Sequence, residues 1–216
     1  PSICQIHSDV NYISLLNILR TFITSKYYMK SEKEKMLAGE LYDPLDRQLS
    51  DERLQTRLLI KALNDTREDE TEERANVLKA LIPNAGNGLW IQPPFYCDYG
   101  SNIKMGEKVF FNFNCVVLDV CEVTIGSRTL FGPNVQIYTA THPINHNERA
   151  SGLEYAKPIS IGEDVWIGGS VVICPGVSIG DRAVIGAGSV VTKDIAGDVF
   201  AAGNPCKVIR ALEQNE

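Results

Sequence analysis

Histidine is the side chain that most readily moves protons near neutral pH, and the 216 residues contain three, His7, His142 and His146. His142 lies near the start of THPINHNERASGLEYAKP (141–158), a polar segment without internal repetition. An imidazole with an unperturbed pKa of about 6.5 can take a proton from an attacking hydroxyl group and return it to a leaving group. On the residues alone, a general base and an ordinary surface or packing histidine are equally good interpretations of His142.

Three further short polar residues carry no indication of a binding role in their local sequence alone. These are Asp43 in ELYD, Asp98 in CDYG and Asn112 in FNFN. On local sequence alone, Asp43 before Pro44 is a turn residue, and Asn112 is an asparagine at a bend between two strands.

These candidates are distributed around a repeat of six residues. From Ile161 to Val190 the chain reads IGEDVW, IGGSVV, ICPGVS, IGDRAV, IGAGSV, with Ile first in every hexad and Gly second in four of them. A period of six fits neither an amphipathic helix nor a simple half-buried strand. Hexads are typical of β-solenoids, in which each short strand buries a side chain and stacked coils supply the core. The sequence therefore predicts a mainly β, parallel β-helix over residues 89–192.

Irregularities in the repeat indicate where a site could lie. The rhythm slips by two residues between Val117 and Ile125, and between Ile137 and Ile161 it gives way to the polar segment, which is as long as one coil. Insertions in solenoids form surface loops that often bind ligands. We therefore predict a protruding loop over residues 142–158.

The flanking segments differ from the repeat. Residues 29–88 carry apolar residues at helical spacing, among them Leu54, Leu58 and Leu63, and are predicted to be helical. Residues 193–216 leave the repeat as a C-terminal segment. Residues 1–28 precede a charged run that begins at Met29, so we interpret them as an upstream tail or an added segment; a helix that contacts another subunit is the alternative.

Composition excludes several classes of function. A net charge of −6 and an isoelectric point near 5.2 argue against nucleic acid or an anionic membrane as a partner. The six cysteines show no CxxC or zinc-finger spacing and no secretory signal is evident, which predicts a reduced, cytoplasmic setting. No apolar run reaches the roughly 18 residues that a membrane span needs.

The motifs together resemble those of one known group, the hexapeptide-repeat acyltransferases, and within it the maltose and galactoside O-acetyltransferases. The resemblance runs from about Met29 to Arg210 and is carried by MLAGELYD, PPFYCDYGSNI, FNFN, YTATHPI, VWIGG, IGAGSVVTKDI and AAGNPCKVIR. It implies a left-handed β-helix and an enzyme that moves the acetyl group of acetyl-CoA, without a metal, to a maltose-, glucose- or galactoside-like sugar. It also implies a homotrimer, because the coenzyme groove needs walls from two subunits.

The same resemblance assigns roles in catalysis. His142 would be the general base, and backbone N–H groups such as those of Gly168 and Gly169 would stabilise the oxyanion. Glu154 would either orient the imidazole or be a solvated loop carboxylate. The galactoside enzymes carry an acidic residue where this chain has Val120, which puts galactoside preference in doubt and favours a maltose-type or another acceptor.

Binding residues are carried over in the same way. Residues 29–88 would form the acceptor side, and the substrate-binding residues would be Asp43, Asp98 and Asn112, with Arg53 as a weaker candidate. The coenzyme-binding residues would be Trp166, Gly169, Ala187, Thr192, Lys193, Lys207 and Arg210. The cations among them would meet phosphates, although basic residues near a C-terminus are otherwise usually solvated.

Three alternatives remain open. A γ-class carbonic anhydrase shares the β-helix, but a catalytic zinc typically takes three histidines and only His142 and His146 lie near the solenoid. The acceptor could instead be an antibiotic or serine. A catalytically silent β-solenoid scaffold would turn over no thioester.

Overall fold

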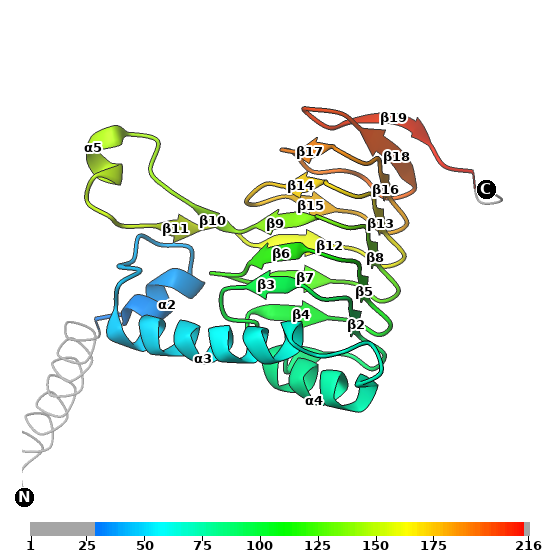
Figure 1. Ribbon diagram of the computed structural model, residues 1–216. Helices are drawn as coiled ribbons and strands as arrows, with labels where there is room; N and C mark the ends of the chain where they lie inside the picture. The colour runs from blue at the N-terminus through cyan, green and yellow to red at the C-terminus, as the bar shows by residue number, and fades with distance from the viewer. Residues whose placement is uncertain (1–28, 214–216) are drawn as a thin grey trace, which may run out of the picture. The chain divides into compact units, whose positions relative to one another are not determined.

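The computed structural model describes residues 29–213 (Figure 1). The interpretation of residues 1–28 therefore concerns a segment outside the described residues. Residues 32–213 fold as one compact unit. It begins with three helices, α2 (Glu32–Leu37), α3 (Arg47–Asn64) and α4 (Thr71–Leu81), which lead into a solenoid.

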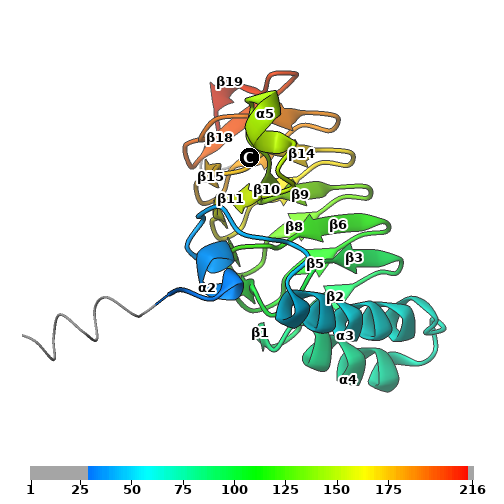
Figure 2. The ribbon, with the colours of Figure 1, turned by 90° about the vertical axis from the view of Figure 1, so that its left-hand side faces the viewer.

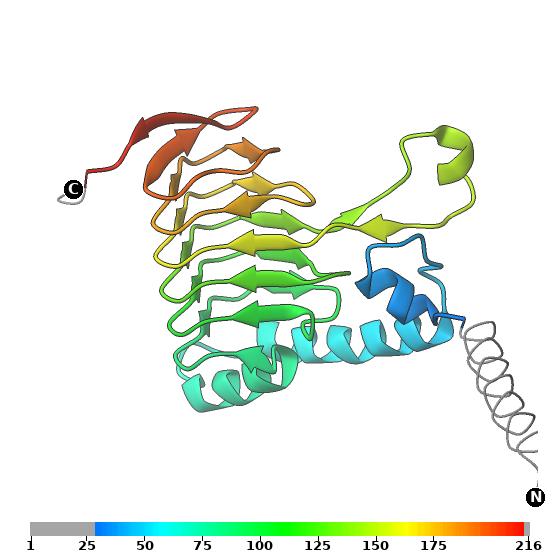
Figure 3. The same ribbon diagram turned by 180° about the vertical axis from the view of Figure 1, so that it is seen from behind.

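Each coil of the solenoid contributes short strands to three sheets (Figures 1 and 3). Sheet 1 contains β1 (Asn84–Ala85), β4 (Ile103–Met105), β7 (Val123–Ile125), β12 (Ile159–Ile161) and β15 (Ser178–Ile179). Sheet 2 contains β2 (Trp90–Ile91), β5 (Phe110–Phe111), β8 (Leu130–Phe131), β13 (Trp166–Ile167), β16 (Val184–Ile185), β18 (Val199–Ala202) and β19 (Lys207–Ala211). Sheet 3 contains β3 (Phe95–Cys97), β6 (Cys115–Leu118), β9 (Gln136–Tyr138), β14 (Val172–Ile173) and β17 (Val190–Val191). The result is a left-handed parallel β-helix of about 6 turns, which confirms the predicted fold class.

The hexads form the core of this helix. The first residue of each hexad, from Ile161 to Ile185, points inward and is buried, as are the aliphatic residues at the fifth place, such as Val165 and Val171. Burying one such side chain contributes roughly 1.5–3 kcal/mol. In the early coils aromatic residues take the inward place, and the rings of Phe111 and Phe131 stack with centroids 4.1 Å apart.

Glycine at the second place of a hexad is required by the spacing of the coils. A Cβ atom on Gly126 would lie 2.4 Å from backbone atoms of Gly162 and Glu163 in the next coil, closer than real Cβ atoms approach. The strict Ile-Gly pairing is therefore a consequence of stacking: Ile fills the interior, and Gly lets the next coil approach at strand spacing.

Helices α3 and α4 cover the first coil (Figure 2). Ile60 and Leu63 of α3, with Leu78 and Leu81 of α4, join the core formed by the first strands. The predicted apolar face of α3 was partly wrong. Leu54 and Leu58 are exposed, and the buried residues of this helix are Leu49, Thr56, Ile60 and Leu63.

The last coil continues beyond the final hexad. Ile195 bridges to Ile179 in sheet 1, and β18 pairs in parallel with β16. β19 then returns antiparallel to β18, with Arg210 opposite Phe200. The C-terminal segment, which is predicted to leave the six-residue repeat, thus continues sheet 2 after that repeat ends.

The polar insertion forms a hairpin that extends away from the solenoid on the side of α2 (Figures 1 and 3). Its strands are β10 (Ala140–Thr141) and β11 (Tyr155–Ala156), and a short helix, α5 (His146–Arg149), lies near its tip. Asn145 caps this helix, because its side chain accepts a hydrogen bond from the N–H of Asn147 at 2.9 Å.

None of the helices in residues 29–213 is long and apolar enough to cross a bilayer. The described cysteines are all free thiols.

Candidate active site

The corner between sheet 3 and sheet 1 is enlarged in successive coils. In a regular coil six positions separate the inward residues Ile173 and Ile179 across this corner, whereas eight separate Val117 from Ile125. In the following coil the same corner opens into the hairpin β10–β11. The two-residue slip and the interrupted repeat of the sequence therefore coincide in space, and the candidate site is built there.

His142 follows β10 directly, and its side chain is 55% exposed. β10 pairs antiparallel with β11, with Thr141 opposite Tyr155. Glu154, the residue before Tyr155, therefore lies beside His142, the residue after Thr141. Oε1 of Glu154 is 3.9 Å from Nε2 of His142, which is longer than a hydrogen bond. Catalytic hydrogen bonds are often this long before substrate binds. The carboxylate is therefore within a small movement of the imidazole.

Tyr42 holds Glu154 in this position. The N–H of Tyr42 donates to the carbonyl of Glu154 at 2.9 Å, and the N–H of Glu154 donates in return at 3.1 Å. The hydroxyl of Tyr42 also donates to Oε2 of Glu154 at 3.1 Å. Burial and the neighbouring carboxylate raise the pKa of Tyr42 well above its usual value, so this hydroxyl stays a proton donor. One oxygen of Glu154 is thus bound, and the other is left for His142.

A small apolar cluster supports the corner from below. It gathers residues from the N-terminal helices, the enlarged corners and the hairpin: Met36, Tyr42, Leu49, Tyr99, Val120, Cys121 and Ala156. Val120 is buried in this cluster. An acidic residue at that place would have to be buried or displace its neighbours, so the departure at Val120 is matched by an apolar environment.

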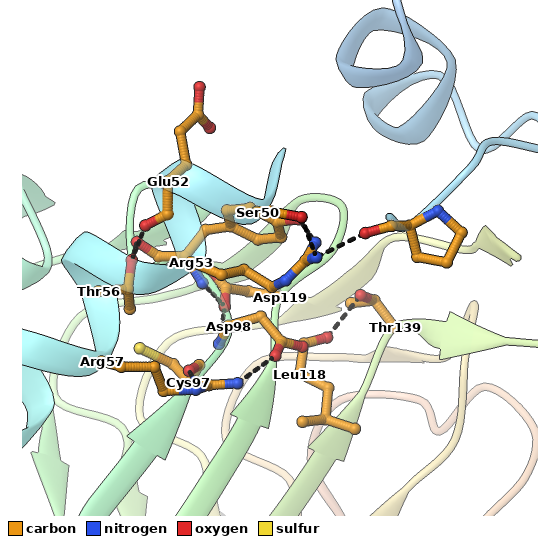
Figure 4. A network of polar contacts seen from close by, with 12 residues as sticks. Ser50, Glu52, Arg53, Thr56, Arg57, Cys97, Asp98, Leu118, Asp119 and Thr139 are labelled. Carbon is orange, nitrogen blue, oxygen red and sulfur yellow. Dashed lines mark hydrogen bonds and ion pairs between the residues drawn. The ribbon is translucent and has the colours of Figure 1, made fainter. Parts of the chain in front are cut away.

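Asp98 lies at the enlarged corner, in the first coil. Its side chain is 14% exposed, and its Oδ1 accepts a hydrogen bond from Nη2 of Arg57 at 3.1 Å. Arg57 belongs to α3 and also donates to the carbonyl of Cys97 (Figure 4). From the next coil, Oδ1 of Asp119 accepts the backbone N–H groups of Asp98 and Tyr99, both at 2.9 Å. Asp98 is therefore held from the helix and from the neighbouring coil.

The side chain of Asp43 is exposed, whereas that of Arg53 is held by several hydrogen bonds. Asp43 is exposed and follows Tyr42 in the chain; one of its oxygens accepts the N–H of Leu45 at 2.9 Å. Arg53 donates to the hydroxyl of Tyr99 at 2.7 Å and to the carbonyl of Pro44 at 2.5 Å. The guanidinium of Arg53 thus ties α3 to the corner, which is a structural use of this weaker candidate.

Asn112 lies away from this group. It follows β5 at the corner between sheets 2 and 3, whereas His142 and Asp98 lie at the corner between sheets 3 and 1. Its Oδ1 accepts the N–H of Phe113 at 2.8 Å. Within one chain, therefore, the structure brings Asp98 and His142 to one corner and leaves Asn112 at another.

The two candidate oxyanion donors also lie at the corner between sheets 2 and 3. The N–H of Gly168 already donates to the carbonyl of Ile185 at 2.8 Å, so it cannot serve. The N–H of Gly169 makes no such bond within the described chain, which leaves it available.

Most coenzyme candidates share sheet 2 and its border. Trp166 is 57% exposed and stands between Leu130 and Val184 of the neighbouring coils. Lys207 and Arg210 lie on β19, at the end of the same sheet. Gly169 and Ala187 lie at the corner that follows this sheet in adjacent coils, whereas Thr192 and Lys193 follow β17 at the corner between sheets 3 and 1.

Sequence reasoning assigned no role to Tyr42, Arg57 or Asp119. The only signal for them was the two-residue slip, which marks the corner that Asp119 occupies. Within residues 29–213 no group of three His, Cys, Asp or Glu side chains could hold a metal ion.

Comparisons with known proteins identify the family of this chain. The motif described as the maltose acetyltransferase hexapeptide capping motif matches residues 35–86, and the bacterial transferase hexapeptide, with six repeats, matches residues 158–193. Galactoside O-acetyltransferase of Escherichia coli is 43% identical over 85% of this chain and 90% of that protein.

Solved structures show the same likeness. A maltose O-acetyltransferase from Clostridium difficile has a TM-score of 0.85 and 49% identity, covering 86% of this chain and 99% of that one. A galactoside acetyltransferase in complex with coenzyme A has a TM-score of 0.83 and 42% identity, covering 87% and 94%. The chain therefore belongs to the maltose and galactoside O-acetyltransferase family of hexapeptide-repeat acyltransferases, which confirms the resemblance seen in its motifs.

Proposed function

We propose that this chain moves the acetyl group of acetyl-CoA directly to a hydroxyl of a maltose-, glucose- or galactoside-like sugar, with His142 as general base. The coarser part follows from family membership: the chain is an acetyl-CoA-dependent sugar O-acetyltransferase. The observation that carries the finer part is the group formed by Tyr42, Glu154 and His142, which presents a half-exposed imidazole at the root of the hairpin.

The chemistry follows from this group. Glu154 faces Nε2 of His142 and favours a proton there, which leaves Nδ1 to accept the proton of the sugar hydroxyl. As that proton leaves, the sugar oxygen forms a bond to the thioester carbonyl carbon, and the N–H of Gly169 is the candidate donor to the resulting oxyanion. The intermediate then breaks its C–S bond, and the imidazolium returns the proton to the departing thiolate.

We propose a homotrimer, because the residues of one chain do not complete a site. Asn112 and Gly169 lie at a different corner from His142, so a neighbouring chain must supply them. The outward face of sheet 2 supports such an association: it carries an apolar column in register, made of Trp90, Phe110, Leu130, Trp166, Val184 and Phe200. An apolar face of this kind is expected to pack against another surface.

The same face is our candidate for the coenzyme groove. Trp166 would pack against the pantetheine arm, and Gly169 and Ala187 would let it approach the backbone. Lys207 and Arg210 would pair with its phosphates, as would Lys193 of the neighbouring chain, because Lys193 lies at the corner between sheets 3 and 1 that also carries His142. Asp43 and Asp98 would bind sugar hydroxyls on the other side of His142.

Acetyl-CoA consumption with maltose, glucose and thiogalactosides as acceptors tests the proposal. We expect release of free thiol that depends on the sugar, measured with a thiol reagent. If acetyl-CoA raises the melting temperature but no sugar is acetylated, the sugar assignment is wrong, and amine-containing antibiotics and serine are the next acceptors. If acetyl-CoA neither reacts nor shifts the melting temperature, the chain is a silent scaffold.

Glu154→Gln is expected to lower kcat by roughly 10- to 100-fold, the usual effect of removing a partner that orients a histidine. The KM for acetyl-CoA should not change, because Glu154 lies away from sheet 2. Steady-state kinetics in both substrates measure this split. Glu148→Gln is the matched control, since Glu148 is an exposed glutamate of the same hairpin. A native kcat in Glu154→Gln would show that the carboxylate does not orient His142 and that Glu154 serves only to link the hairpin to Tyr42.

A further inference from the structure

We propose that Asp119 is a positioning residue of the active site, whose buried carboxyl group sets the place of Asp98 relative to the hairpin that carries His142. This inference rests on the proposed function, because it concerns how the acceptor is held. Asp119 itself is 0% exposed and cannot touch a substrate.

The first step of the argument is the pair of bonds to the preceding coil. Oδ1 of Asp119 accepts the backbone N–H groups of Asp98 and Tyr99 at 2.9 Å each (Figure 4). The backbone carbonyl of Asp119 accepts a hydrogen bond from Nδ2 of Asn102 at 2.7 Å. These three bonds span the extra residues of the first enlarged corner. The residues of that corner lie outside the β-strands. Asp119 therefore supplies hydrogen-bond acceptors for backbone N–H groups that, in regular coils, bond to the next strand of the sheet.

The second step is the link to the following coil. The hydroxyl of Thr139 donates to the carbonyl of Leu118 at 2.6 Å and accepts the N–H of Cys121 at 3.2 Å. Thr139 is fully buried and stands three residues before His142. The residues on both sides of Asp119 are therefore hydrogen-bonded to the root of the hairpin. Together, the bonds made by Asp119 and Thr139 connect the coil of Asp98 to the coil of His142.

The third step is the energetic cost of this arrangement. Oδ2 of Asp119 has no hydrogen-bond partner, and burial raises the pKa of this carboxyl group to about 7, while its two N–H bonds lower it. The charged or titratable groups that face it are Asp98, which raises its pKa further, and the thiols of Cys97 and Cys121; Arg57 reaches the corner through Asp98. A buried carboxyl group with an unpaired oxygen destabilises the fold. We therefore assign Asp119 a role in the site rather than in stability: it holds the two backbone N–H groups of Asp98 and Tyr99 in place.

Two substitutions of Asp119 distinguish its hydrogen bonds to Asp98 and Tyr99 from a general contribution to the stability of the fold. Asp119→Asn keeps an oxygen that can accept both N–H groups, and it should keep the KM for the sugar within about threefold of native. Asp119→Ala removes that oxygen and should raise the KM for the sugar roughly 10- to 100-fold, because a small displacement of a binding group has effects of this size. The KM for acetyl-CoA should not change in either variant. Asp119→Ser, which cannot reach both N–H groups, replaces the alanine variant if that variant does not fold.

Thr129→Val is the matched control. Thr129 is fully buried and also bridges two coils, donating to the carbonyl of Gly162 at 2.8 Å and accepting the N–H of Val165 at 3.2 Å, but at a corner without site residues. It should lower the melting temperature and leave the KM for the sugar unchanged. Equal changes in both KM values for Asp119→Ala, or an asparagine variant as impaired as the alanine variant, would overturn the inference.

The pH dependence of stability gives an independent readout. The pKa of Asp119 is raised in the folded chain, so the folded state holds the proton more tightly than the unfolded state. Its contribution to stability is present below about pH 4 and is lost as the pH rises through about 7. Urea unfolding at fixed protein concentration should show this slope in the native chain and not in Asp119→Asn.

The native chain in the same assay separates the two proposals. No sugar turnover by the native chain would refute the proposed function and this inference with it. Native turnover together with an unchanged KM for the sugar in Asp119→Ala would refute the role of Asp119 alone.

Discussion

His142→Ala is expected to lower kcat for sugar acetylation by about 10²- to 10⁴-fold, the effect typical of losing a general base. A sugar hydroxyl is a poor nucleophile near neutral pH, and alanine cannot take its proton. The KM for acetyl-CoA and the melting temperature should stay near native values, because the imidazole is half-exposed. Sugar-dependent thiol release under saturating substrates measures the loss.

His146→Ala is the matched control for this prediction. His146 is an exposed histidine of the same hairpin, in the first turn of α5, where alanine is a good helix former. It should retain native kcat. A native rate in His142→Ala would show that the imidazole is structural and that the proposed mechanism is wrong.

Mixed trimers of two impaired variants are expected to recover about a third of native activity. If each site takes His142 from one chain and Asn112 from the next, every trimer that contains both His142→Ala and Asn112→Ala chains keeps about one of its three sites intact, whichever variant is present twice. Each variant alone should be much less active, because a sugar site that loses a hydrogen-bond donor loses transition-state binding. Co-expression of the two chains with different tags, followed by isolation of mixed species and the thiol assay, measures the recovery.

The control for complementation uses two residues from one corner. Asp98 and His142 belong to the same corner of the same chain, so a mixture of His142→Ala and Asp98→Ala contains no chain with both and should recover nothing. Recovery in this second mixture, or none in the first, would contradict the proposed division of the site between chains. A monomer in sedimentation would exclude the division altogether.

Much of the fold could be predicted because its contacts repeat along the chain. Ile167 packs above Ile185 at a fixed offset of 18 residues, so the hexads alone place the inward side chains, and the Ile-Gly pairs report the close stacking that Gly126 requires. The helices were harder to predict. Leu54 and Leu58 fit the helical spacing as well as Ile60 and Leu63 do, but only the side of α3 that packs on the solenoid is buried. That side carries Thr56 together with Ile60 and Leu63.

The site was only partly visible in the sequence. The break in the repeat marked His142, and the resemblance of ATHP, CDYG and FNFN marked its candidate partners. Neither could show that the N–H of Gly168 is spent in the β-ladder, or that Arg53 is occupied by Tyr99. A group at a corner can bind a ligand only if the folded chain leaves it without a hydrogen-bond partner, and a local sequence motif does not contain that information.

The sequence by itself therefore determined the solenoid, the place of the insertion and the family to which the chain belongs. All three depend on short-range patterns that repeat or are retained as motifs. Only the tertiary structure decided which residues meet at the enlarged corner. Tyr42 binds Glu154 across 112 positions and Asp119 holds Asp98 from the next coil, because chain segments with no periodic relation come together once the coils stack. It also separated Asn112 from His142, since three-sided coils place residues from different hexads at different corners.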